Sequence, residues 1–296
     1  MLGVVNLDKP VGPTSHDMVG LLRRLTGTRR IGHAGTLDPL ASGVLPILVG
    51  AATRLSEELT GGRKRYDAVI RLGARSATDD AEGPIEPVNV PLPSQHAVAA
   101  ALAGFVGTFE QRPPAFSARK WAGRIAHRAA RGGEPLDLPA RTVTVDALDL
   151  TGIEIEEGRM DVRVDLRCGA GTYVRSIARD LGERLGCGGH LVALRRTEAA
   201  GLRVEDALTP ARLEALAAGG RLADAFLSPG DLLPLPHVTL PPDDAWRFIH
   251  GSSVSLPELP AWERAAVFDG ATLLGVGTVV AGALRPDKVL QGELAR

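Results

Sequence analysis

The clearest pattern in the chain is a strict alternation of apolar and charged residues just past its midpoint. Four apolar positions alternate with four charged ones: Met160, Val162, Val164 and Leu166 with Asp161, Arg163, Asp165 and Arg167. A period of two places the two kinds of side chain on opposite faces of a sheet, so this segment predicts a strand with one buried face. The pair Glu157-Gly158 precedes it and predicts a turn that joins it to another strand, within residues 141–167.

Other segments show helical spacing or short apolar runs. Helices are predicted from Ser15 to near Gly27, from Ser94 through Leu102, from Val174 to Gly186, and over about 209–218. Strands are predicted at 2–8, 66–73, 265–269 and 273–280, and a glycine-rich loop from Gly32 to Gly43. Strands that pair through hairpins, with helices between them, favour an α+β fold with a central, mainly antiparallel sheet over a doubly wound parallel sheet.

The character of the chain changes after the run Leu233-Pro234-Leu235-Pro236. Beyond it, short strand candidates are separated by glycine and proline, which is typical of a small β-rich domain. We therefore expect a large domain at 1–235 and a small one at 236–296. A length of 296 residues suits one large and one small domain.

Composition narrows the class of protein. The chain is 44% hydrophobic and 23% charged, with a formal net charge of -1, so any nucleic-acid binding must rest on a local basic face. Two cysteines cannot build a disulfide scaffold, and the spacing of Cys168, Cys187, His190 and His33 fits no recurrent zinc pattern. No signal peptide and no membrane-spanning run is evident, so the cytoplasm is the expected compartment.

The densest chemical signal is GHAGTLDPLASGVL, residues 32–45. Its glycines allow backbone shapes and close approaches that a side chain would block. Pro39 disfavours a helical backbone at Asp38, which predicts an acid held on an extended or turn backbone. Two interpretations follow with equal weight: Asp38 is aimed at a substrate, or it hydrogen-bonds its own turn. His33 is either a polar loop residue or a substrate contact.

Residues 32–45 resemble, almost position by position, the catalytic motif of the TruB family of tRNA pseudouridine synthases. Further motifs of that family occur in the expected order, over roughly residues 3–235. They are NLDKPVGPTSHD, RKRYDAVIRLG, TDDAEG, PPAFSARK, CGAGTYVRSIARDLGERLG and LVALRRTEAAG. The tail resembles, more weakly, a small PUA-type RNA-binding domain.

This resemblance implies an enzyme that converts uridine 55 in the T loop of tRNA to pseudouridine. Asp38 would be the essential acid, Arg175 its ion-pair partner, and Tyr66 would stack on the uracil and help to move its C5 proton. Tyr173 and Leu194 would line the pocket. Contacts to RNA or to the active-site loop would come from His33, Lys9, Lys64, Arg65 and Lys120.

The implied reaction breaks the N1–C1′ bond, turns the uracil and rejoins it through C5. No atom is gained or lost, so no cofactor and no metal is expected. The carboxylate of Asp38 would attack C1′, as in retaining glycosidases, or remove a sugar proton. The expected partner is tRNA, through its T-arm; no membrane or protein partner is expected, and the enzyme should be a monomer.

A basic and aromatic segment, residues 111–131, carries six cations and no acid: Arg112, Arg119, Lys120, Arg124, Arg128 and Arg131. Phe116, Trp121 and His127 are interleaved with them, which suits RNA binding by charge and stacking. The segment resembles the RNA-gripping thumb of the family, expected at about 111–140. The family often has tyrosine at Phe116 and an aromatic ring near His127, so single hydrogen bonds are in doubt.

Two other functions compete with this one. Gly169-Ala170-Gly171 between a strand and a helix imitates a dinucleotide-binding loop, but Val174 stands where the third glycine belongs. The alternating strand before it also differs from the buried strand of a parallel sheet. The second competitor is an RNA chaperone without catalysis, which would use the same basic surface.

Overall fold

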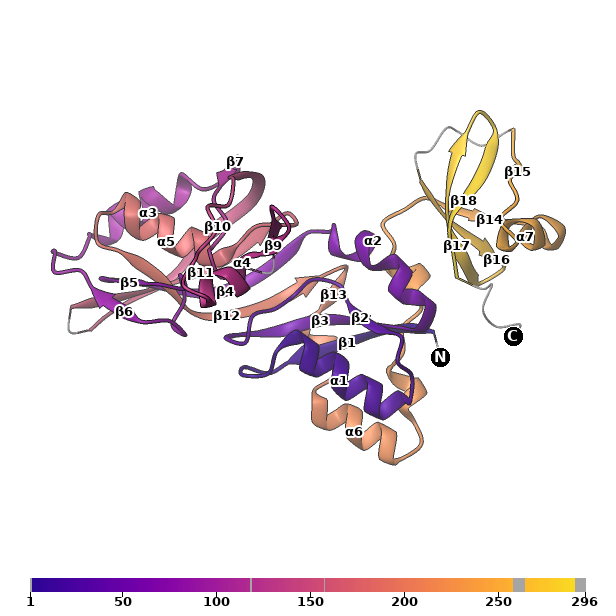
Figure 1. Cartoon of the computed structure of the whole chain (residues 1–296), viewed down its shortest axis with the longest axis horizontal. Helices are drawn as coiled ribbons and strands as arrows, with labels where there is room; N and C mark the ends of the chain where they lie inside the picture. Colours follow the sequence, from indigo (N-terminus) through magenta and orange to yellow (C-terminus); the bar gives the residue numbers. More distant parts are fainter. Residues whose placement is uncertain (1, 118, 157, 258–263, 291–296) are drawn as a thin grey trace.

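The computed structural model describes residues 2–117, 119–156, 158–257 and 264–290. A nine-stranded sheet with strand order β1–β3–β12–β4–β11–β10–β7 forms the larger part, and β2 and β13 extend it beside β3 and β12 (Figure 1). The strands are β1 (Gly3–Lys9), β2 (Ile31–His33), β3 (Ala41–Val49), β4 (Lys64–Leu72), β7 (Gly107–Gln111), β10 (Arg141–Glu156), β11 (Arg159–Cys168), β12 (Gly189–Ala199) and β13 (Leu202–Arg203).

Every pairing in this sheet is antiparallel except that between β3 and β12, which confirms the predicted mainly antiparallel α+β fold. The alternating segment forms β11, and its apolar residues are buried as expected. Strands β10 and β11 form the predicted hairpin; Glu157 of the predicted turn lies outside the described residues.

Four helices cover the sheet: α1 (Ser15–Thr26), α3 (Gln95–Ala103), α5 (Val174–Arg184) and α6 (Pro210–Ala218). Helices α3 and α5 lie over the half that contains β10, β11 and β12, whereas α1 and α6 lie beside β1 and β2 (Figure 1). All four predicted helices are present. Thr14 caps α1 through a capping box with Asp17.

The predicted glycine-rich loop proved too long, because strands occupy both of its ends. Residues Ala41–Val49 form β3 at the centre of the N-terminal half of the sheet, so the loop shrinks to 34–40. Glycine and proline in this segment hid the strand. Gly43 has a φ of 101°, and a Cβ there would lie 2.2 Å from the carbonyl oxygen of Arg196 on β12. The absence of a side chain at Gly43 therefore allows the backbones of β3 and β12 to approach closely.

Shorter elements complete the larger part. The pair β5–β6 and the pair β8–β9 are small separate ribbons. The elements are η1 (Gly50–Leu55), α2 (Ser56–Thr60), β5 (Ala74–Ser76), β6 (Ile85–Pro87), β8 (Lys120–Trp121), β9 (Arg124–Ile125), α4 (Ala126–Arg131), η2 (Val204–Asp206), η3 (Leu222–Ala225) and η4 (Pro229–Leu232).

The C-terminal residues form a separate five-stranded sheet, β14–β16–β17–β18–β15, with one helix (Figure 1). The strands predicted at 265–269 and 273–280 are both present. The elements are β14 (His237–Thr239), α7 (Pro242–Ile249), β15 (Val254–Ser255), β16 (Ala265–Asp269), β17 (Thr272–Val280) and β18 (Ala283–Val289). Across the described residues of both domains, no helix has the length and apolar character needed to cross a membrane.

The small domain is held to the large one by apolar contacts and by one buried acid. Leu55 and Leu59 of the large domain share a buried cluster with Phe268 and Val276 of the small one. Glu58 of α2, whose side chain is 2% exposed, pairs with Arg264 and, at 3.0 Å, with Lys288. Burial alone would raise the pKa of Glu58, but the hydrogen bonds from Lys288 and Arg264 hold it below its usual value.

Glu58→Gln is expected to lower the free energy of unfolding by about 1–3 kcal/mol at pH 7, because two cations lose their buried partner. Glu57→Gln is the matched control: Glu57 also bonds Lys288, but its side chain is 81% exposed, so a loss below about 0.5 kcal/mol is expected. Chemical denaturation measures both. Equal losses in the two variants would contradict the assignment.

The ion pairs of Glu58 with Arg264 and Lys288 also predict that the stability of the fold depends on pH. The folded-state pKa of Glu58 lies below its ordinary value of 4.5, so its stabilising effect is complete above that pH. It disappears as the pH falls through the lower, folded-state pKa. The difference in stability between wild type and Glu58→Gln should therefore vanish in strong acid.

Candidate active site

The loop that carries Asp38 is fixed from several sides. It joins β2 to β3, and the carbonyl of Asp38 accepts a hydrogen bond of 3.0 Å from the amide of Ala41. Ser15 on α1 bonds both backbone groups of Leu37, at 2.8 and 2.9 Å. The amide of Gly12 donates to the carbonyl of Pro39 at 2.8 Å. These hydrogen bonds hold the turn without the carboxylate of Asp38, which is therefore free to face another partner.

Lys9, at the end of β1, adds a charged anchor beneath this loop. Its side chain is buried, and its ammonium donates to the carbonyls of Pro10 at 2.8 Å, Pro13 at 2.7 Å and Pro39 at 3.5 Å. Burial lowers the pKa of Lys9 to about 8, against the raising effect of the Asp38 charge. The group is therefore still protonated at neutral pH. Lys9 holds the two proline-containing turns together.

Arg175, in the first turn of α5, receives the Asp38 carboxylate. The ion pair measures 2.9 Å, between an arginine side chain that is 6% exposed and a carboxylate that is 41% exposed. The same guanidinium pairs with Asp80 at 3.3 Å and donates to the carbonyls of Thr78 at 3.1 Å and Phe116 at 3.0 Å. A buried guanidinium held by these groups therefore fixes the direction of the Asp38 carboxylate.

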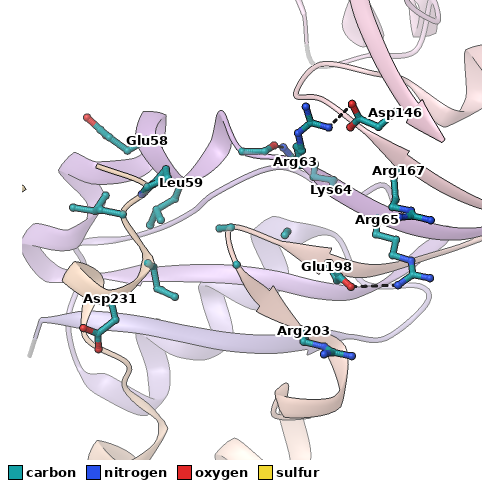
Figure 2. Close-up of a pocket in the computed structure, with 17 residues that line it drawn as sticks. Glu58, Leu59, Arg63, Lys64, Arg65, Asp146, Arg167, Glu198, Arg203 and Asp231 are labelled. Carbon is teal, nitrogen blue, oxygen red and sulfur yellow. Dashed lines mark hydrogen bonds and ion pairs between the residues drawn. The ribbon is translucent and has the colours of Figure 1, made fainter. Parts of the chain in front are cut away.

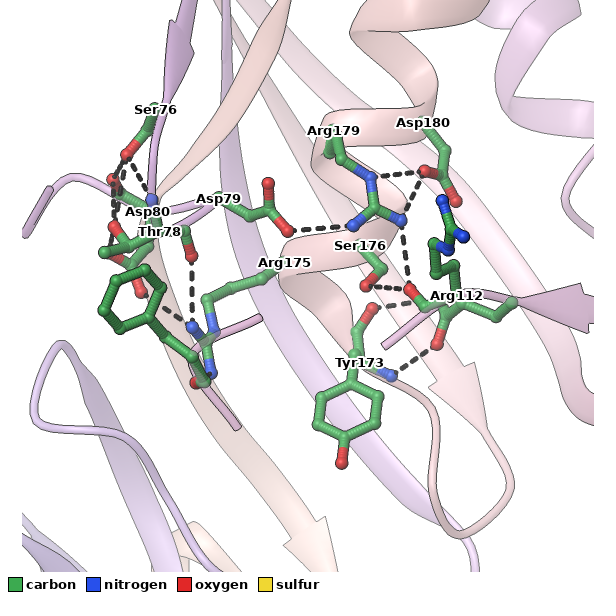
Figure 3. Close-up of polar contacts among 12 residues, drawn as sticks. Ser76, Thr78, Asp79, Asp80, Arg112, Tyr173, Arg175, Ser176, Arg179 and Asp180 are labelled. Atoms are coloured by element: carbon green, nitrogen blue, oxygen red, sulfur yellow. Dashed lines mark hydrogen bonds and ion pairs between the residues drawn. The ribbon is translucent and has the colours of Figure 1, made fainter. Parts of the chain in front are cut away.

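Asp80 is the buried partner on the far side of Arg175. It accepts a hydrogen bond from the Thr78 hydroxyl at 2.5 Å (Figure 3). It accepts another from the amide of Glu82 at 3.0 Å. Its neighbour Asp79 has a positive φ of 62° and pairs instead with Arg179, one helical turn after Arg175, at 3.0 Å. Burial raises the pKa of Asp79 to about 6, although Arg179 acts to lower it.

A cavity of about 290 Å³ opens beside Asp38. Six of the ten side chains that the sequence nominated line it: Asp38, Lys64, Tyr66, Tyr173, Arg175 and Leu194. They come from the β2–β3 loop, from β4, from the start of α5 and from β12. The fold thus gathers residues that lie up to 156 positions apart in the sequence around one hollow.

A buried phenol and three cations, those of Lys64, Arg175 and Arg196, line the cavity. Tyr66 is 6% exposed, and burial raises the pKa of its phenol, which is therefore protonated at neutral pH. Lys64 donates to the carbonyls of Thr60 at 2.8 Å and Gly62 at 2.9 Å. Burial, followed by the nearby charge of Arg196, lowers the pKa of Lys64 to about 8.

The other four nominated residues lie away from the cavity. Lys9 supports its loop from below, and Lys120 is exposed on the β8–β9 ribbon. His33 is half-buried on β2, where burial and the charge of Arg196 lower the pKa of its imidazole. Arg65 is held by two acids: Asp165, at 3.0 Å from Nε, and Glu198 at 3.4 Å.

A larger hollow, of about 850 Å³, lies between the large domain and the segment that leads to the small one (Figure 2). Lys64 lines both hollows, so the two are neighbours. The larger has a mixed charge, with Arg63, Lys64, Arg65, Arg167 and Arg203 beside Glu58, Asp146, Glu198 and Asp231. Within it, Arg63 pairs with Asp146 (Figure 2).

The loop before α5 does not have the form of a dinucleotide site. The amide of Tyr173, at the start of the helix, donates to the side chain of Gln111 at 2.8 Å, and Gln111 donates back to the Tyr173 carbonyl at 3.1 Å. A bound phosphate would need free N–H groups at this end of the helix, and Gln111 already occupies that of Tyr173. Cys168 and Cys187 are buried free thiols, and no three potential metal ligands gather within the described ranges.

Sequence reasoning overlooked two residues of this site. Asp80 lies in the segment TDDAEG, but nothing there showed which of the adjacent acids faces Arg175. Arg196 also lines the cavity and is 1% exposed. Its only signal was membership of the pair Arg195-Arg196 on a predicted family motif.

Comparisons with known proteins identify one family. Residues 23–174 match the model "TruB family pseudouridylate synthase (N terminal domain)", and residues 175–234 match "tRNA pseudouridylate synthase B C-terminal domain". The tRNA pseudouridine synthase B of Ralstonia nicotianae is 42% identical over 97% of this chain and 94% of its own length. That of Burkholderia mallei is 42% identical over 97% of this chain and 96% of its own.

Solved structures show the same fold. The crystal structure of a Cbf5-Nop10-Gar1 complex contains a chain that aligns with a TM-score of 0.74 and 26% identity, over 98% of this chain and 85% of its own. A chain of an H/ACA RNP bound to a substrate RNA aligns with a TM-score of 0.72 and 25% identity, over 98% of this chain and 85% of its own. This chain therefore belongs to the TruB family of tRNA pseudouridine synthases, enzymes that isomerise uridine to pseudouridine.

Proposed function

We propose that this enzyme isomerises uridine 55 in the T loop of tRNA, with Asp38 as its catalytic carboxylate. The observation that carries the proposal is the ion pair of Asp38 with Arg175 at the wall of a cavity of about 290 Å³. Asp38 is the more exposed member of the pair, so it can reach a substrate while the arginine stays fixed. Because the substrate is tRNA, we place the enzyme in the cytoplasm.

The cavity is small and concave, so the target nucleotide must leave its stack to enter it. Extraction of a base costs a few kcal/mol and is cheapest in a loop. Proteins read such loops by shape, phosphate contacts and stacking. The T loop offers a substrate of this kind. Within the cavity, Tyr66 would stack on the uracil, and Tyr173 and Leu194 would complete its walls.

The chemistry needs an ionised acid beside C1′ of the flipped nucleotide. Asp38 either attacks C1′ or removes a sugar proton, and both routes cleave the N1–C1′ bond. The uracil then turns and C5 bonds to C1′; this step releases Asp38 from C1′ on the first route and returns the proton from Asp38 to the sugar on the second. The proton on C5 departs as N1 gains one. A protonated Tyr66 is suited to stacking and to donating a hydrogen bond; accepting the C5 proton would require that it first lose its own.

RNA binding would use the thumb, residues 111–140, and the small domain, residues 236–296, which we regard as PUA-like. Lys120 and its neighbours present exposed cations on β8, β9 and α4. Lys64, Arg65 and His33 would meet RNA nearer the cavity. Phe116 lacks the hydroxyl of a tyrosine, but it contacts Arg175 through its carbonyl oxygen, which does not depend on the side chain. A chaperone activity could use the same surface, and loss of catalysis would leave it intact.

Asp38→Asn should abolish turnover, with a fall on the order of 10⁴ or more, because an essential nucleophile or base is lost. The variant should still bind unmodified tRNA. Turnover is measured by mapping pseudouridine on a tRNA transcript without added cofactor. Binding of unmodified tRNA is measured by filter binding. Asp67→Asn, on the opposite face of β4, is the matched control and should keep its activity. Pseudouridine formed by Asp38→Asn at the wild-type rate would remove Asp38 from this role.

Asp80→Asn should lower the single-turnover rate roughly 10- to 100-fold, since a small misplacement of Arg175 disturbs the reactive geometry. Affinity for tRNA should change little. The control is Asp79→Asn, which removes the adjacent carboxylate but leaves Arg175 with both of its acids, because Asp79 pairs with Arg179. If the two variants lose rate equally, Asp80 has no special part in holding Arg175.

Replacing both Arg119 and Lys120 by alanine should weaken tRNA binding and flatten its salt dependence. Each lost phosphate contact lowers the slope of log K against log salt by roughly 0.7–0.9. A double change of Arg24 and Arg212, which are exposed on α1 and α6, removes the same charge elsewhere and should alter the slope less. Binding titrations at several salt concentrations measure this slope for both double variants and for the wild type. An unchanged slope in the Arg119/Lys120 variant would show that the thumb does not grip the backbone.

A further inference from the structure

Arg196 on β12 is a charged residue whose burial demands a reason. It is 1% exposed and is among the largest fully buried side chains of the chain. Within the described residues, no carboxylate forms an ion pair with it. A buried cation without an acid is costly unless hydrogen bonds satisfy its donors.

Three of those donors go to the segment that bears the catalytic acid, and the guanidinium also interacts with the phenol of Tyr66. Nε donates to the carbonyl of Val44 at 2.7 Å, Nη2 to that of Gly35 at 3.0 Å, and Nη1 to that of Thr36 at 3.4 Å. Val44 lies after Asp38 in the sequence, and Gly35 and Thr36 lie before it. One guanidinium therefore holds both ends of the Asp38 loop.

The surrounding backbone is shaped to admit this side chain. Arg196 stands opposite Gly43 in the parallel pairing of β12 with β3, and opposite Tyr66 in the antiparallel pairing with β4. A Cβ on Gly43 would collide with the Arg196 backbone, and one on Gly35 would lie 3.4 Å from Nη1. Both glycines have positive φ angles, of 101° and 92°. Arg196 thus sits between the strand that continues the Asp38 loop and the strand that carries Tyr66.

We propose that Arg196 is a positioning residue of the isomerisation: its guanidinium ties the Asp38 loop, through Gly35 and Thr36, to Val44 on β3 and so sets how far Asp38 reaches into the cavity. This inference rests on the proposed function. The role of Arg196 differs from that of Arg175, which forms an ion pair with the carboxylate itself. Arginine suits the task because its planar fork can direct charged donors at three separate carbonyls, whereas the ammonium of lysine is a single point.

The test is Arg196→Lys, which keeps the charge and most of the stem but loses the fork. A second variant, Arg196→Gln, keeps donors without the charge. The matched control is Arg195→Lys, on the adjacent residue, whose side chain is 42% exposed and pairs with Asp8. Each variant is assayed for folding by circular dichroism, for tRNA affinity by filter binding, and for the single-turnover rate on a tRNA transcript.

We expect folded Arg196→Lys to bind tRNA within about threefold of wild type and to react about 10²-fold more slowly, because the acid is misplaced rather than lost. Hydrogen exchange should quicken at the loop amides of Ala34, Leu37 and Ala41, which are bonded in the structure, and stay unchanged in α6. The same split is expected of Arg196→Gln.

The inference is overturned if a folded Arg196 variant reacts at the wild-type rate, or if its rate falls only as far as its affinity does. Unaltered exchange at the loop amides would equally refute the proposed link. These outcomes are separate from failure of the proposed function, which would appear as a wild-type enzyme that makes no pseudouridine at position 55.

Discussion

The site depends on one ion pair, between Asp38 and Arg175. Its two members come from opposite halves of the large domain, and they meet only because β12 joins the strand β3 of one half to the strand β4 of the other. The arginine is buried and held by two carbonyls and a second acid, so it has little freedom. The carboxylate remains partly exposed. One rigid partner and one accessible partner give a carboxylate that is held in direction and open to a substrate.

Backbone carbonyl groups accept the hydrogen bonds of several cations in the cavity and beneath its loop. The ammonium groups of Lys9 and Lys64 and the guanidinium of Arg196 donate to main-chain oxygens of nearby loops, not to carboxylates. Burial of these cations carries an energetic cost, which charge-assisted hydrogen bonds offset. The arrangement keeps the loops in place without neutralising the cavity. A polyanionic substrate would therefore meet a positive environment around a single acid.

The small domain is attached through the same region. Helix α2, which carries Glu58, ends at Thr60, and Thr60 and Lys64 both line the cavity. The ion pairs of Glu58 with Arg264 and Lys288 thus lie within a few residues of the strand that bears Tyr66. Apolar contacts reinforce them. The position of the small domain and the shape of the cavity are consequently linked by a short stretch of chain.

The sequence by itself determined the α+β class, the β10–β11 hairpin, the four main helices and the family, because period-two and helical spacing and short ordered motifs are local properties. It also marked Asp38, Tyr66, Arg175, Tyr173 and Leu194, but through resemblance to a family, since on local physics Asp38 could equally have bonded its own turn. Only the tertiary structure showed that β2 and β3 occupy the two ends of the predicted loop, that Asp80 and not Asp79 faces Arg175, and that Arg196 secures the Asp38 loop. Each of these depends on contacts between residues far apart in the chain, and no local pattern of side chains encodes which buried charge will meet which carbonyl.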